Sequence, residues 1–137
     1  AIKHVGEGAK THYLRKAVAQ GFDDAAFIDR HGRLGEATIW NLAFWDGRSV
    51  VWPRAQILAG TMMGIVQRQL GSLGIAQRHE DVFLDGLDKF AGAAVMNSWT
   101  PGVALTAIGS VSMPEAPEFL DALRAAFNAE PDVALTT

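Results

Sequence analysis

The chain has 137 residues, of which 49% are hydrophobic and 20% are charged. This size and composition are typical of one globular domain with its own hydrophobic core, and they exclude a disordered chain and a membrane-spanning one. The formal net charge is −3 and the lysines and arginines are scattered, so we expect neither a nucleic-acid partner nor a membrane partner.

The sequence contains no cysteine, which excludes a disulfide framework and a thiolate metal site. No charged-then-apolar leader resembles a signal peptide, and we therefore expect a cytoplasmic protein. Ala1, Ile2 and Lys3 resemble the interior of a strand. We expect that further sequence precedes them in the native protein.

The first half of the sequence predicts one helix followed by a β-meander. Apolar residues recur at helical spacing between residues 7 and 20, and Gly21 provides a stop for that helix. Apolar runs then predict three strands that are joined by tight, glycine-containing turns. The strands are expected at residues 25–29, 38–45 and 50–52, and the turns at residues 31–32 and 46–47.

The second half predicts two longer helices with short strands between them. Apolar residues keep a helical period over residues 61–73, where Gly74 ends the helix, and a last helix follows Pro117 with a frayed tail beyond residue 130. The elements expected between them are a strand at 75–79, a short helix at 84–90, and strands at 93–98 and 103–108 with a turn at 101–102. The sheet should therefore have about six strands.

Two places could bind a ligand, although each has an ordinary explanation. Lys3 lies in an apolar strand, where a lysine usually protects a sheet edge or marks a solvated strand end. Gly60, Thr61 and Met62 open a helix directly after a loop. Backbone N–H groups at such a helix start can hold a phosphate, but a glycine turn before an ordinary helix explains the same residues.

Three further polar residues lie close to predicted strand ends. Glu36 lies between a glycine turn and an apolar strand, where it could be an ordinary solvated acid. Alternatively its carboxylate pairs with the nitrogen of a pyridine ring and keeps that nitrogen protonated, which makes the ring an electron sink. Ser98 and Thr100 offer hydroxyl groups at a strand-to-turn transition, and turn chemistry explains them equally well.

The histidines and most of the tryptophans have ordinary structural explanations. The histidines are dispersed without the spacing of a helical metal site, so we expect no metal: His4, His12, His31 and His79. The four tryptophans are expected to fill core or interface, since strand tryptophans bury large areas. Trp99 is the exception that we retain, because it lies between the two hydroxyl residues.

Together these stretches resemble amino-transferase class IV, the group of branched-chain and D-amino-acid aminotransferases, in order and spacing along the whole chain. Residues 3–6 (KHVG), Ala17 and residues 21–25 (GFDDA) look like the family's lysine strand, helix and following strand. Residues 29–36 (DRHGRLGE), which run into residues 40–42 (WNL), look like its signature D-x-x-G-x-(x)-E-x-x-x-x-N.

Two later stretches extend the resemblance to the phosphate-binding elements of the family. Residues 58–62 (LAGTM) resemble its L-P-G-(I/V)-T loop, and residues 93–100 resemble the strand that ends in its second phosphate contact. The resemblance implies an α/β domain with a curved mixed sheet flanked by helices, the C-terminal domain of the fold type IV pyridoxal-phosphate enzymes. Residues 1–137 would form this single cofactor-binding domain, and the N-terminal domain of the family would be absent from the chain.

The resemblance also implies a role for individual residues. Lys3 would form the Schiff base with pyridoxal 5'-phosphate and move the substrate proton, and Glu36 would pair with the pyridine nitrogen. Leu58 would pack on one face of the ring. The remaining cofactor-binding residues would hold the phosphate: Gly60, Thr61, Met62, Ser98 and Thr100.

The implied activity is an aminotransferase that moves an amino group between an amino acid and a 2-oxo acid. Alternatives are an aminodeoxychorismate lyase that uses the same lysine and cofactor, or a non-catalytic fragment of such an enzyme. The family works as homodimers, so the chain could associate with a second copy or with a separate N-terminal half.

Two departures from the family pattern bear on these roles. Met62 stands where the phosphate loop is expected to end in threonine, so the phosphate contact there would come mainly from the backbone. Gly8 and residues 98–100 (SWT) replace the tyrosine and the G-T-A of branched-chain members, so the resemblance does not specify a branched-chain substrate.

Overall fold

The computed structural model describes residues 2–6, 24–28, 32–37, 41–54, 61–97 and 100–130. The helix predicted at residues 7–20 and the tail predicted beyond residue 130 lie outside these ranges. No helix within them is long and apolar enough to cross a membrane.

Strands make up most of the elements in the described ranges. The ten strands are β1 Ile2–Gly6, β2 Asp24–Ile28, β3 Leu34–Ala37, β4 Asn41–Trp45, β5 Val50–Pro53, β6 Gln77–Glu80, β7 Gly92–Asn97, β8 Thr100–Ala104, β9 Ala107–Ile108 and β10 Val111–Ser112. The helices are α2 Thr61–Ser72, the 3₁₀ helix η1 Leu84–Lys89 and α3 Pro117–Ala129. The two longer helices and η1 confirm the helices predicted at 61–73, after Pro117 and at 84–90.

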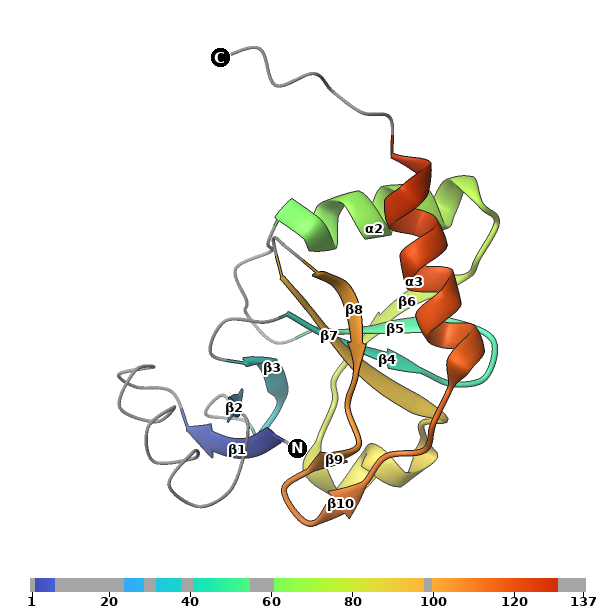
Figure 1. Ribbon diagram of the computed structural model, residues 1–137. Coiled ribbons are helices and arrows are strands. Elements are labelled where there is room, and N and C mark those ends of the chain that lie inside the picture. The colour runs from blue at the N-terminus through green and yellow to red at the C-terminus, as the bar shows by residue number, and fades with distance from the viewer. Residues whose placement is uncertain are drawn as a thin grey trace, which may run out of the picture.

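The strands form a mixed sheet that branches at β4. Hydrogen-bonded neighbours run in the order β10-β9-β1-β2-β3-β4-β5-β6, while β7 pairs with β4 and with β8. β1 is parallel to β2 and β9, and β5 is parallel to β6, whereas the other pairs are antiparallel. Figure 1 shows β1, β2 and β3 grouped on one side, and β4, β5, β7 and β8 next to α2 and α3. The predicted mixed α/β fold is confirmed.

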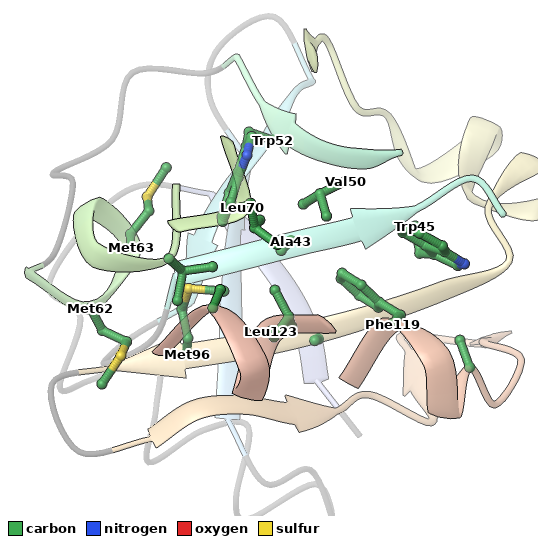
Figure 2. Close-up of a cluster of buried hydrophobic side chains, with 14 residues drawn as sticks. Ala43, Trp45, Val50, Trp52, Met62, Met63, Leu70, Met96, Phe119 and Leu123 are labelled. Atoms are coloured by element: carbon green, nitrogen blue, oxygen red, sulfur yellow. The ribbon is translucent and has the colours of Figure 1, made fainter. Parts of the chain in front are cut away.

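The side chains of β4 alternate between two hydrophobic clusters, one on each face of the sheet. Leu42 and Phe44 belong to the cluster that η1 helps to close. Ala43 and Trp45 belong to the cluster formed with α2 and α3 (Figure 2). Because successive residues of a strand face opposite sides, helices on both sides bury all five residues of β4. β4 is therefore the central strand of the core.

Each long helix buries one apolar stripe against this sheet. The buried residues of α2 are Met62, Met63, Val66 and Leu70, and those of α3 are Phe119, Leu123 and Ala126. The helices also share a polar contact, because Arg68 and Gln69 both donate hydrogen bonds to the Glu130 carboxylate, at 2.7 and 2.6 Å. Packing thus holds α2 in a defined place over β4 and β7.

The turn predicted at residues 101–102 is wrong. Pro101 and Gly102 lie within β8, which pairs with β7 through Asn97 and Thr100, so the chain reverses before Pro101. A Cβ atom on Gly102 would lie 2.9 Å from Leu123 Cδ1. The glycine is therefore needed for the close approach of α3 to the strand rather than for a turn.

Of the strand predicted at residues 38–45, the structure describes β4, Asn41–Trp45, and residues 38–40 lie outside the described ranges. A separate strand, β3, precedes β4, so Glu36 lies inside a strand instead of before one. The run predicted as one strand at 103–108 is divided between β8 and β9, and β10 was not predicted. Strands of two residues are too short for a hydrophobic period to reveal, which explains why about six strands were expected.

Candidate functional site

The structure describes the backbone of five of the eight predicted site residues. Lys3 lies in β1 and Glu36 in β3. Thr61 is the first residue of α2, Met62 follows it, and Thr100 begins β8. The other three predicted residues lie outside the described ranges: Leu58, Gly60 and Ser98.

Three strands meet at Asn41, the first residue of β4. Asn41 pairs with Glu36 of β3 on one side and with Met96 of β7 on the other. The next residue of β7, Asn97, pairs with Thr100. The pairing register therefore brings Glu36 and Thr100, which are far apart in the sequence, to the same end of the central strands.

Lys3 lies two strands away from Glu36 in the same sheet. It pairs with Ala25 of β2, and the next residue of β2, Ala26, pairs with Ala37 of β3. Two strand spacings of about 4.8 Å each separate β1 from β3. Lys3 is level with Ala25 and Glu36 with about Phe27, two residues further along β2, so the backbone positions of Lys3 and Glu36 lie about 12 Å apart, with β2 between them.

The start of α2 lies over this end of the sheet. Met62 is only 3% exposed and belongs to the same cluster as Met96, which Figure 2 shows beside the first turn of α2. The backbone N–H groups of a first helical turn have no acceptor within the helix and carry partial positive charge. The first turn of α2 contains no acidic residue that would compete for them. The helix start can therefore accept an anionic group.

The Met62 side chain is buried in the core. Its burial against the sheet leaves the backbone N–H as the group that Met62 could offer to a ligand. That a phosphate would be held mainly by backbone groups at this position stays a prediction.

Three of the perturbed ionisable groups among the described residues lie at the opposite end of β4, whereas the fourth, Glu130, has its pKa lowered by hydrogen bonds from Gln69 and Arg68 of α2. Burial opposes ionisation of Asp46, but hydrogen bonds from the Ser49 backbone, Arg78 and the Arg48 backbone outweigh it and lower its pKa to about 2. Hydrogen bonds to Asp46 and Glu80 raise the pKa of Arg78. The hydrogen bond from Lys89 lowers the pKa of Glu80. These charges stabilise the turn after β4 and do not belong to the predicted site.

A groove of about 310 Å³ lies between the end of β8 and the first half of α3. Ala104 and Leu120 form part of its apolar lining, and Asp121 and Arg124 add one charge of each sign. None of the eight predicted site residues lines it. The groove and the predicted cofactor site are separate features of the molecule.

Sequence reasoning assigned no role to Asn41, which the structure pairs with Glu36 on one side and with Met96 on the other. It is 7% exposed, and it is the single polar residue among the buried side chains that the structure describes. The available signal was the asparagine that ends the family signature, which falls on residue 41, five positions after Glu36.

Comparison with known proteins relates this arrangement to one family. Residues 1–108 match the family described as amino-transferase class IV. This range includes all eight predicted site residues. A search of curated proteins found no match.

Similar solved structures share the fold at low sequence identity. A putative 4-amino-4-deoxychorismate lyase from Legionella pneumophila has a TM-score of 0.84 and 15% identity, over 93% of this chain and 54% of that chain. A fold IV-transaminase from Curtobacterium pusillum has a TM-score of 0.79 and 18% identity, over 95% and 53%. A PLP-bound hypothetical aminotransferase from Mycobacterium tuberculosis has a TM-score of 0.81 and 17% identity, over 93% and 55%. The chain thus spans about half the length of these proteins.

Proposed function

Because the chain belongs to amino-transferase class IV, we propose that it is the cofactor-binding domain of a pyridoxal 5'-phosphate-dependent aminotransferase. Enzymes of this family use this cofactor. The substrates would be an amino acid and a 2-oxo acid, between which the amino group is transferred. The observation that carries the proposal is the family match over residues 1–108, which includes the lysine strand, the Glu36 strand and the start of α2.

The residues in place fit the chemical groups of the cofactor. A lysine, a carboxylate and a helix start without acidic residues suit an aldehyde, a pyridine nitrogen and a phosphate, respectively. When bound, pyridoxal phosphate supplies a ring that accepts the electrons released at the substrate Cα. Lys3 would hold the cofactor covalently through Nζ and, once released by the substrate amine, would move the proton from the substrate Cα.

The other site residues would bind and orient the cofactor. The Glu36 carboxylate would accept a hydrogen bond from the protonated pyridine nitrogen. The phosphate would receive hydrogen bonds from the Thr61 hydroxyl and backbone and from the Met62 N–H, and Gly60 would let the backbone approach it. Leu58 would pack on one ring face. Ser98 and Thr100 would complete the phosphate site.

A pyridoxal-phosphate lyase is the second candidate function. The Legionella pneumophila protein with the TM-score of 0.84 is described as a putative 4-amino-4-deoxychorismate lyase, and its likeness to this chain shows a shared fold. Both reactions need the same lysine and cofactor. Product analysis separates them, because a lyase releases pyruvate without needing a 2-oxo acid as acceptor.

Several properties of the whole protein stay predictions. We propose that the chain is the C-terminal domain of a longer enzyme, since it spans about half of its structural relatives. Homodimeric assembly, or association with a separate N-terminal half, would complete the site. A cytoplasmic location rests on the sequence alone.

Absorbance spectroscopy tests the cofactor proposal. Purified protein mixed with pyridoxal phosphate should develop a band near the visible edge that borohydride reduction abolishes, and Lys3→Ala should not develop it. Lys89→Ala is the matched control, because Lys89 forms a surface ion pair with Glu80 at 2.9 Å, in the charged network at the far end of β4. A band of equal size in Lys3→Ala, or no band in the wild type, would contradict the proposal.

A further inference from the structure

The Gln77 side chain joins three elements through two hydrogen bonds. Trp52 Nε1 of β5 donates to Gln77 Oε1 at 2.8 Å, and Gln77 Nε2 donates to the backbone carbonyl of Gln67 in α2 at 2.9 Å. Gln77 pairs with Val50 of β5, and both Val50 and Trp52 belong to the cluster formed with α2 (Figure 2). The Gln77 amide therefore lies between the sheet and the helix.

The partners of this amide fix its orientation. An indole N–H can only donate a hydrogen bond, and a backbone carbonyl can only accept one. Exchanging the oxygen and nitrogen of Gln77 would leave the N–H of Trp52, whose side chain is fully buried, without a partner. One orientation of the amide thus links β5 and β6 to a single carbonyl of α2.

The hydrogen bond from Gln77 adds direction to a helix contact that is otherwise adaptable. The side chains that α2 buries in the cluster are apolar: Met62, Met63, Val66 and Leu70. Hydrophobic contact is non-directional, and unbranched methionine side chains adjust to small shifts. A hydrogen bond weakens steeply as its angle departs from linearity, so the bond to the Gln67 carbonyl limits movement of α2 along its axis.

We propose that Gln77 is a positioning residue for the phosphate end of the cofactor: by holding the Gln67 carbonyl, it sets the place of the N–H groups of Thr61 and Met62. This inference rests on the proposed function, in which those groups bind the phosphate. Thr61 is six residues before Gln67 in the same helix, or about 9 Å along its axis. Binding groups must be held within about 0.5 Å of their productive positions, so a small shift of the helix at Gln67 matters at its start.

Titration with two forms of the cofactor tests the inference. Gln77→Met keeps a side chain of similar length and breaks both hydrogen bonds. It should weaken the binding of pyridoxal 5'-phosphate, followed by absorbance, roughly tenfold, because hydrogen bonds to the charged phosphate are misaligned. Binding of pyridoxal, which lacks the phosphate, should stay within about twofold of the wild-type value.

Trp52→Phe is a milder second variant, and it decides the question if Gln77→Met does not fold. It keeps a buried ring and removes the N–H that orients the Gln77 amide. The loss should again be selective for pyridoxal 5'-phosphate, at about threefold. Unchanged affinity for this ligand in the folded variants would overturn the inference.

Val51→Ala is the matched control, since Val51 is adjacent to Trp52 in β5 but is buried in the cluster on the opposite face of the sheet. It should lower the urea midpoint of unfolding while leaving both affinities within about twofold. Equal weakening of both ligands by Gln77→Met, or the same selective loss in Val51→Ala, would overturn the inference. Failure of the wild type to bind either ligand would instead overturn the proposed function and, with it, this inference.

Discussion

The two ends of β4 differ in the interactions that hold them. At the end that begins with Asn41, buried side chains of β4 and β7 lie near the first turn of α2, and Met62 and Met96 pack in the same cluster between helix and sheet. At the other end, Trp45 stacks on Phe119 with ring centroids 5.5 Å apart. The turn that follows is held by charged side chains: Asp46, Arg78, Glu80 and Lys89.

We expect the charged end of β4 to contribute to stability and the end that begins with Asn41 to contribute to cofactor binding. The charged end contains well-paired groups, such as the Asp46 carboxylate that accepts hydrogen bonds from the Arg48 and Ser49 backbones at 2.8 and 2.6 Å. These charged side chains are engaged with one another and with the backbone of the turn. The other end uses adaptable thioether side chains and a helix start, which leave backbone donors for an anion. Mutations at the two ends should therefore have distinguishable effects.

The largest expected effect on stability comes from the aromatic stack. Phe119 is 1% exposed, so Phe119→Ala should lower the free energy of unfolding by about 3–5 kcal/mol in urea titrations. Phe127→Ala, on the same helix at 37% exposure, should change it by less than about 1 kcal/mol. Cofactor affinity of the folded Phe119→Ala fraction should stay at the wild-type value. A large loss of affinity would show that the two ends are coupled.

A smaller effect is expected from restoring the family's threonine at the helix start. Met62→Thr removes buried volume and buries a hydroxyl, so it should lower the free energy of unfolding by about 1–3 kcal/mol. Because this side chain faces the core, the new hydroxyl should not improve the affinity for pyridoxal phosphate in an absorbance titration. Tighter binding by Met62→Thr would mean that residue 62 can turn its side chain toward the phosphate.

The smallest effect is expected at the charged turn, and it depends on pH. Hydrogen bonds lower the pKa of Asp46 from 3.8 to about 2, so its contribution is complete above pH 4 and is lost as the pH falls toward 2. Asp46→Asn should lower the free energy of unfolding by about 1 kcal/mol at pH 7, and the difference from wild type should shrink between pH 4 and 2. Asp121→Asn, an exposed residue of α3, is the control. A pH-independent difference would contradict the assigned pKa.

Prediction from the sequence was correct where one hydrophobic period extends over a long segment. The apolar spacing of residues 61–73 and of the segment after Pro117 predicts α2 and α3, because each helix buries a single stripe. It failed where tertiary contacts override local preference. Pro101 and Gly102 are typical turn residues, yet the approach of Leu123 to Gly102 places both in β8.

In the candidate site, too, residue order predicts some features, whereas others depend on contacts between distant segments. Lys3 and Glu36 could be named from the resemblance to a family, since that depends on residue order alone. The meeting of Glu36, Asn41 and Met96 depends on strand pairing between segments about 55 residues apart in the sequence, which no local pattern records. The burial of Asn41 and its place between Glu36 and Met96 are therefore visible only after the strands are paired.

Peptide mapping after borohydride reduction tests the central claim, that Lys3 is the lysine that holds the cofactor. The protein would be incubated with pyridoxal phosphate, reduced, digested and analysed by mass spectrometry, which distinguishes the four lysines: Lys3, Lys10, Lys16 and Lys89. The account predicts a phosphopyridoxyl group on Lys3 at stoichiometric cofactor, with the other three unmodified. Modification spread over all four lysines, or concentrated on one other than Lys3, would contradict it.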